Sequence, residues 1–414
     1  MALPANIAVT FDFSSGPTFG YPFTIGDAKY GVLGTGTLAS STVPEPTVDL
    51  TPDVTSISIK RARNIVQDTY EVGTATIRVN DPNSYFNPQN TLSPYFGYLT
   101  PLRKIRVSAT VNGNAYFLGS FYTTAYIYTY PTGQETGYVD IQCSDAFRLF
   151  NMANVQTVSG ALNGDKTGVR IGEILDQMNF PTSMRTIDTG DTSCQADPGT
   201  LRTGLSAIKN AEFSEQGAFY VNPSGTAVFK SRTNVIKAAG STPIEFNQTS
   251  GIPYKNLVFT FNDQLIVNSA AMTRVGGVTQ TYQNAASIAK YFPHQSNQND
   301  LVAQTDADVA NIAAIYVATR AETTIRIDAM TIDLLDPAVP TQTILGLDYF
   351  QQLKITNIQP DGSTIVKTLQ CQGLDWQITP NKMQVTVTTL EPIVEGFIIG
   401  SNVSGIISSS ILAY

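Results

Sequence analysis

The sequence predicts a mainly β fold with small α+β insertions. Apolar and polar residues alternate over several short stretches, such as 72–79 and 105–111, and this two-residue period is typical of half-buried strands. The 414 residues include 31 glycines and 22 prolines, which favour frequent turns. Only 14% of the residues are charged, against about 25% in typical soluble domains, so the surface is either covered by partners or solvated by Thr, Ser and Asn.

The chain begins with a segment, 1–52, that is rich in Gly, Pro, Thr and Ser and has only short apolar runs. We expect an extended N-terminal arm or short strands there rather than a domain. The whole chain is long enough for two to four domains with proper cores.

Residues 53–150 predict a first β module. Apolar positions alternate between 72 and 79, and Asp81-Pro82-Asn83 ends this strand because Pro82 has no backbone donor and Asn and Asp close local turns. Asn87-Pro88 punctuates the loop that follows. Further along, Asn112-Gly113 is a strong signal for a two-residue hairpin turn.

Residues 151–250 predict a small α+β segment. Apolar residues with helical spacing indicate an amphipathic helix at Ile171, Ile174, Leu175 and Met178. Leu201, Leu205 and Ile208 indicate a second helix. The turn residues at 222–225 then predict a compact hairpin.

Residues 251–390 predict a second β module that is interrupted by one helix, at 305–321. Thr305 and Asp308 have the spacing of a capping box at the start of that helix. The turn signal at 359–362 predicts a hairpin between two later strands.

Internal repeats predict that the chain holds two related modules. The motif that starts at Phe23 and ends at Leu38-Ala39 recurs with identical spacing from Phe397 to Leu412-Ala413. We therefore expect residues 391–414 to form a C-terminal arm that repeats the 23–39 motif. The hairpins that start near residues 102 and 353 lead to Cys143 and Cys371, which predicts matching places for these cysteines.

The composition excludes several classes of function. The net charge of −8 argues against a protein that grips nucleic acid, although like charge suits a surface past which DNA slides. The three cysteines, Cys143, Cys194 and Cys371, are too few and too widely spaced for a disulfide framework or a zinc site. We expect no signal peptide, because the N-terminus has no basic region, and no membrane span, because no apolar run is long enough.

No catalytic, cofactor or metal motif is recognisable, so we expect no enzyme and no cofactor. His294 is the single histidine, which excludes a histidine-based triad or a site with two histidines. The carboxylate pairs Asp306/Asp308 and Asp328/Asp333 have the residue types of a glycosidase, but we favour a solvated or lumen-facing acidic surface as their explanation. Calcium is conceivable at 81–84, where turn chemistry also accounts for the residues.

Two surface patterns have more than one interpretation. Lys60-Arg61-Ala62-Arg63 is the one dense basic cluster, and we expect a salt-bridged face between subunits rather than a phosphate site, because a single short cluster supplies few phosphate contacts. A stripe of tyrosines indicates either core packing or a contact face for sugar or a subunit: Tyr122, Tyr126, Tyr128 and Tyr130.

The stretch YEVGTATIRVNDPNSYFNPQN, followed by SPYFGYLTPLRKIRV and FLGSFYTT, resembles the minor tail or baseplate (tail-tip) hub proteins of long-tailed bacteriophages. The resemblance is strongest at 53–150, good at 254–292 and weak across 151–250. It implies two tail-tube-like β-barrel modules in one chain. The motifs that carry it are structural: Gly73, Asp81, Pro82, Asn83, Asn87, Pro88, and Pro101 before the next strand.

The resemblance implies a virion protein that assembles in the host cytoplasm and closes the distal end of the tail tube. Such hubs are usually homotrimers, whose two modules per chain form a pseudo-sixfold ring that conducts DNA during ejection. The implied partners are the tail tube or distal tail protein, the tape-measure protein and tail-tip or fibre proteins. A carbohydrate-binding adhesin at the tail tip is the alternative, and a glycosidase is a third.

Overall fold

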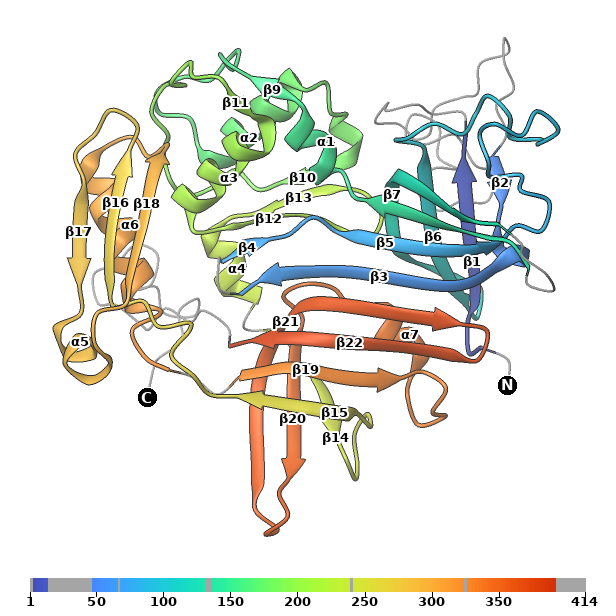
Figure 1. Ribbon diagram of the computed structural model, residues 1–414. Helices are drawn as coiled ribbons and strands as arrows, with labels where there is room; N and C mark the ends of the chain where they lie inside the picture. Colours follow the sequence, from blue (N-terminus) through green and yellow to red (C-terminus); the bar gives the residue numbers. More distant parts are fainter. Residues whose placement is uncertain are drawn as a thin grey trace.

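One long, twisted sheet runs through the middle of the molecule and supports the other elements (Figure 1). This computed structural model describes residues 3–13, 47–65, 68–130, 136–238, 241–323 and 326–391. Fourteen of the described strands belong to the long sheet, and smaller sheets and short helices surround it. The prediction of a mainly β fold with small α+β insertions is confirmed.

The first module forms one half of the long sheet. Its strands lie in the order β3-β5-β8-β7-β6, and every neighbouring pair is antiparallel. Their bounds are β3 (Val54–Asn64), β5 (Thr74–Asn80), β6 (Lys104–Val111), β7 (Asn114–Thr129) and β8 (Tyr138–Ser144).

Part of the expected N-terminal arm belongs to this module. β1 (Asn6–Asp12) pairs with β6 along its whole length, and its alternating side chains Val9 and Phe11 are buried in the core. The remaining short elements are β2 (Thr47–Asp49), which pairs with β1, the 3-10 turn η1 (Thr51–Asp53), and β4 (Thr69–Tyr70), which pairs with the end of β3.

The second module repeats the first. Its order is β15-β19-β22-β21-β20, from β15 (Lys255–Thr260), β19 (Arg326–Asp333), β20 (Gln352–Ile358), β21 (Thr364–Thr379) and β22 (Lys382–Leu390). α7 (Thr341–Leu345) lies between β19 and β20, and β14 (Ile244–Asn247) pairs with β20. β14 falls within the segment expected to be α+β, so the second module begins earlier than the predicted boundary at 251.

The two modules match in backbone detail as well as in strand order. Leu102 and Phe350 precede the equivalent strands β6 and β20, and both have positive φ, 66° and 70°. The Leu102 N–H donates to the Thr123 carbonyl, and the Phe350 N–H donates to the Cys371 carbonyl, at 2.7 and 2.9 Å. This conformation is rare for residues with side chains, so its recurrence supports the predicted duplication.

The cysteines do not occupy matching places as the sequence predicted. Cys143 lies on β8, opposite Thr123 of β7, whereas Cys371 lies on β21, opposite Thr389 of β22. Because β7 corresponds to β21 and β8 to β22, both modules hold a buried Cys–Thr pair with the two residues exchanged. The prediction is wrong because the two cysteines lie on different strands of their modules. Cys371 belongs to the second strand of the β20–β21 hairpin, and Cys143 belongs to the strand that follows the β6–β7 hairpin.

The modules join edge to edge through β3 and β21, which pair in antiparallel register from Ile57↔Ile378 to Ala62↔Gly373. In the middle of this junction Ile59 faces Trp376, and both side chains are buried. A single hydrophobic core runs beneath both modules. The junction makes the two halves one continuous sheet.

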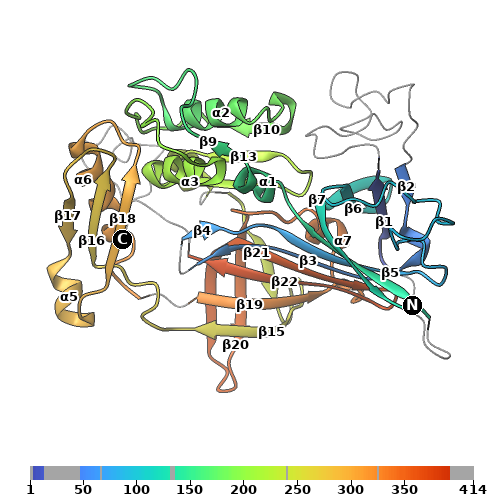
Figure 2. The ribbon, with the colours of Figure 1, turned by 45° about the horizontal axis from the view of Figure 1, so that its top comes forward.

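An α/β segment covers part of the long sheet near β4 (Figures 1 and 2). Its core contains Phe147, Phe150 and Phe219 and includes Tyr70 and Phe350 from the long sheet. The elements of the segment are α1 (Phe147–Met152), β9 (Asn154–Val155), α2 (Thr167–Gln177), η2 (Thr182–Met184), β10 (Arg185–Ile187), β11 (Arg202–Thr203), α3 (Gly204–Glu215), β12 (Ala218–Val221), β13 (Ala227–Lys230) and α4 (Arg232–Ala238).

Residues 262–323 form a separate peripheral domain with its own core, whereas the sequence predicts that they belong to the second module. Its sheet β17-β16-β18 packs against α6, whose capping box at Thr305 and Asp308 is confirmed. The elements are β16 (Ser269–Arg274), β17 (Gln280–Gln283), α5 (Ala285–Tyr291), β18 (Gln295–Leu301) and α6 (Asp306–Ala318). The domain is inserted between β15 and β19 and holds two helices, α5 and α6, where the sequence predicts one. It interrupts the chain of the module but not its sheet.

The predicted hairpin turns have the expected backbone. Asn112 and Gly113 have φ of 51° and 80°, as a two-residue turn between β6 and β7 requires. Gly362, with φ of 84°, closes the turn between β20 and β21. The repeated end motifs at 23–39 and 397–413 lie outside the described residues.

We expect Ile59→Ala to lower the free energy of unfolding by about 2–5 kcal/mol, because it opens a cavity at the module junction. Trp376 is the single tryptophan and lies directly opposite, so its fluorescence during urea unfolding reports on the junction. Lys60→Ala is the control, because Lys60 is the exposed residue next to Ile59. It should change the free energy of unfolding by about 0.5 kcal/mol or less. Equal effects of the two substitutions would contradict a packed junction.

Candidate assembly surfaces and inter-domain junction

The loop at 81–101 is held rigidly by its own polar residues. The buried Asp81 carboxylate accepts the backbone N–H groups of Tyr85 and Phe86, at 2.7 and 2.9 Å. Asn87 accepts from the Gln89 N–H and donates to the Tyr130 hydroxyl. Asp81 is therefore occupied by turn hydrogen bonds, as the turn interpretation of 81–84 predicts.

The same loop presents apolar side chains to solvent. Its inner side is fixed by Phe86, whose ring packs edge-on against Phe11 of β1 and at a tilt against Tyr95. Its outer side exposes Leu92, at 88%, and Phe96, at 48%. The predicted residues Pro82, Asn83, Pro88 and Pro101 are also exposed on this loop.

Gly73 lies where a side chain would collide with a buried carboxylate. Its N–H donates to Asp145 Oδ2 at 2.7 Å, and a Cβ atom built on it would lie 2.6 Å from the same oxygen. The Phe147 N–H donates to the other oxygen, which fixes the start of α1. Burial raises the pKa of Asp145 to about 7, although these two N–H donors and Arg61 favour the charged form.

The basic cluster differs from the expected salt-bridged face between subunits. Only Lys60 is exposed. Arg61 is buried and donates to the Val221 carbonyl of the α/β segment and to Asp348. The Arg63 side chain is only 10% exposed and pairs with Asp68. Both arginines therefore connect parts of the same chain, a role that spacing along the sequence does not reveal.

The other candidates have local partners. Tyr122 is buried, and Tyr126 and Tyr128 pack against the core, so Tyr130 alone is well exposed. Asp328 pairs with Arg326 and Asp333 pairs with Lys255, so each of these two aspartates has its own cationic partner. Asp306 pairs with Arg274, Asp308 caps α6, and His294 contacts the Tyr291 carbonyl.

Two strand edges remain available for pairing. β15 pairs with β19 on one side, and in the described part of the chain no strand occupies its other side. β7 switches from β6 to β8 at Tyr122, so residues 125–129 likewise have a strand on one side only among the described residues. Apolar side chains are exposed at both edges, Ile127 and Val258 at 47% each.

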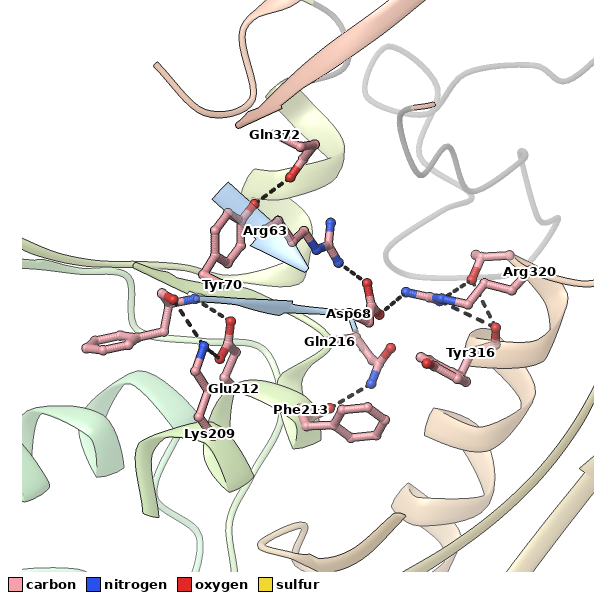
Figure 3. Close-up of polar contacts among 12 residues, drawn as sticks. Arg63, Asp68, Tyr70, Lys209, Glu212, Phe213, Gln216, Tyr316, Arg320 and Gln372 are labelled. Carbon is pink, nitrogen blue, oxygen red and sulfur yellow. Dashed lines mark hydrogen bonds and ion pairs between the residues drawn. The ribbon is translucent and has the colours of Figure 1, made fainter. Parts of the chain in front are cut away.

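Three parts of the chain meet at a buried polar junction between the long sheet, α3 and α6 (Figure 3). Asp68 lies between Arg63 of β3 and Arg320, just after α6, and forms an ion pair with each. Burial alone would raise the pKa of Asp68, but the charges of Arg320 and Arg63 hold it below its usual range. Nearby, Glu212 of α3 pairs with Lys209 and accepts the Phe219 N–H.

The described residues contain no cluster of three or more His, Cys, Asp and Glu side chains that could hold a metal ion. None of the helices in the described ranges is long and apolar enough to cross a membrane. The three cysteine thiols are buried, and burial raises the pKa of Cys194 to about 12, so this thiol stays protonated and unreactive.

Comparison with known proteins finds similarity in structure but not in sequence. No family model and no curated protein matches the chain. The 43 kDa tail protein of prophage MuSo2 from Shewanella oneidensis aligns with a TM-score of 0.55 at 10% identity, over 84% of this chain and 94% of that one. A tail protein from Neisseria meningitidis MC58 aligns with a TM-score of 0.54 at 9% identity over the same shares. The chain therefore has the fold of these tail proteins.

We expect Gly73→Ala to destabilise the protein markedly, because the added methyl group would meet Asp145 at 2.6 Å. Gly172→Ala is the matched control: it lies in α2 with no atom within 4 Å of the new methyl group, and alanine is the better helix former. Thermal unfolding followed by circular dichroism compares the two. A Gly73→Ala variant as stable as Gly172→Ala would contradict the close approach.

Asp145 should make the protein less stable as the pH rises. The folded-state pKa of Asp145, about 7, lies above the ordinary 3.8. The stabilising contribution of this group is therefore complete below pH 3.8 and is lost as the pH rises through about 7. The loss amounts to at most about 4 kcal/mol, from about 1.4 kcal/mol per pKa unit.

Asp145→Asn removes this titration, so urea unfolding from about pH 4 to about pH 8 should show the variant gaining stability relative to wild type. Asp333→Asn is the control of opposite sign. Burial would raise the pKa of Asp333, but hydrogen bonds from Lys255 and other donors lower it below the ordinary 3.8. This variant should therefore lose stability relative to wild type as the pH rises from about 2 to about 5, where the carboxylate ionises, and should show no further change up to about pH 8. A pH-independent difference for Asp145→Asn would contradict the raised pKa.

Proposed function

We propose that this protein is a structural component of a bacteriophage tail, a tail-tip or baseplate hub whose copies join into a ring through their β-sheet edges. One observation carries the proposal: the chain already contains one such joint. β3 of the first module pairs with β21 of the second, and the equivalents of these strands, β15 and β7, leave matching edges unpaired among the described residues.

The internal joint predicts the joint between copies. Since β15 corresponds to β3 and β7 to β21, β15 of one copy would pair with residues 125–129 of the next in the same antiparallel sense. Such a contact joins two different surfaces, and contacts of this kind close into rings when the rotation permits. Three copies would supply six similar modules, the number expected from the resemblance to tail hubs. Exposed Ile127 and Val258 would become buried at each joint.

The polar side of the sheet suits the wall of a DNA channel. Outward-facing side chains on β3, β5 and β8 are short or uncharged for the most part, such as Ser58, Thr76 and Gln142. The net charge of −8 adds no general attraction for DNA. We propose that the ring closes the distal end of the tail tube and lets DNA pass during ejection.

The surrounding parts are candidates for docking other virion proteins. The rigid loop at 81–101 exposes Leu92 and Phe96, and we propose that it contacts a neighbouring copy or tail protein. The tail tube or distal tail protein, the tape-measure protein and fibre proteins are the proposed partners, in a virion assembled in the host cytoplasm. The proposed role is structural rather than enzymatic. The adhesin alternative has less support, because the core takes up most of the tyrosine stripe.

Single charges at the two edges should prevent ring formation. Ile127→Asp and Val258→Lys each bury one unpaired charge at the proposed joint, so each variant should remain monomeric. The double variant places opposite charges on the two edges and should recover assembly in part. Light scattering gives the mass, and electron microscopy gives the symmetry of assembled particles.

Val366→Asp is the matched control, because Val366 is 51% exposed on the β20–β21 hairpin and lies outside both edges. It should leave assembly unchanged. A wild-type protein that stays monomeric both alone and in assembled tails would overturn the ring. If Ile127→Asp and Val258→Lys do not affect assembly, the proposed ring still stands, but the proposed pairing of β15 with residues 125–129 is refuted.

A further inference from the structure

We infer that the junction of the long sheet, α3 and α6 binds a small monatomic anion of the halide class. The site is the cavity beside Arg63, which has a volume of about 30 Å³. The inference does not depend on the proposed role in a phage tail. It rests on the charges that line the cavity, on a buried donor without an acceptor, and on the size of the space.

The charges around the cavity do not cancel. Three cationic side chains line it, from Arg63, Lys209 and Arg320, and two carboxylates, from Asp68 and Glu212. Both carboxylates are already committed: Asp68 pairs with two arginines, and Glu212 pairs with Lys209. Among the described residues one positive charge is left over, in a region where each of these charged side chains is at most 19% exposed and an unbalanced charge is costly.

The unbalanced charge is located at Arg63. Its side chain is only 10% exposed, and its Nε–H has no hydrogen-bond acceptor among the residues that the structure describes. One terminal nitrogen of its guanidinium donates to Asp68 (Figure 3). By contrast, Arg320 on the other side of Asp68 also donates to the carbonyl of Tyr316 and the hydroxyl of Thr319. A buried donor left without an acceptor indicates a missing partner.

The size of the cavity selects the ligand. A volume of about 30 Å³ exceeds the roughly 10–15 Å³ that one water needs, which is enough space for a single monatomic ion. Aromatic and apolar groups close the space, from Phe213, Val235 and Phe350. A chloride ion would accept from the Arg63 Nε–H and balance the extra charge. It would thereby stabilise the contact among the three parts of the chain.

The test is the effect of halide on thermal stability at constant ionic strength. Replacing sodium gluconate by sodium chloride should raise the melting temperature along a saturable curve, because a ligand that binds only the folded state stabilises it. Arg63→Lys keeps the charge but removes the Nε–H, and it should abolish the halide-specific rise. Arg78→Lys makes the same change on the exposed face of β5 and should leave the rise intact.

Crystals of the wild-type protein soaked in bromide give a readout that does not depend on any variant. Anomalous density beside Arg63 Nε is the expected result. A melting temperature that depends on ionic strength alone, or density for a water at this position in bromide-soaked crystals, would overturn the inference. Loss of the halide effect in Arg78→Lys as well would also overturn it, since a general charge effect would then explain the data.

Discussion

The antiparallel pairing of β3 with β21 is the interaction on which the rest of the structure depends. It joins two modules of equal topology into one sheet and places a single core beneath both. Residues next to this strand pair also hold the α/β segment against the long sheet. Arg61 of β3 reaches the α/β segment, and the Tyr70 hydroxyl, next to β3, donates to Gln372 of β21. A change in the register of this pair would therefore move every domain.

The inserted parts are built so that they leave the sheet undisturbed. The α/β segment follows β8 and returns to the long sheet at β14, while the peripheral domain leaves after β15 and returns at β19. Each has its own hydrophobic core. Polar contacts, above all Asp68 between two arginines, fix how these cores lie against the sheet. Hydrophobic burial thus forms the parts, and buried charges orient them.

Local chemistry in the sequence was sufficient to predict much of this structure. The alternation in 72–79, the Asn112-Gly113 turn and the Thr305 cap depend on neighbouring residues, and each has the expected form. Contacts between distant residues could not be predicted in the same way. The buried role of Arg61 depends on contacts with Val221 and Asp348, each more than a hundred positions away. The separate sheet of the peripheral domain depends on which strands become neighbours. A one-dimensional pattern does not contain that information.

The exchanged Cys–Thr pairs allow the two modules to be compared at one equivalent site. Cys143 faces Thr123 in one module, and Thr389 faces Cys371 in the other, so the two copies hold the same pair in opposite order. Each order fills the same interior space with one thiol and one hydroxyl. The two sites lie in one chain and contain the same two residue types. A comparison of them therefore shows the effect of which strand carries the thiol, without a second protein.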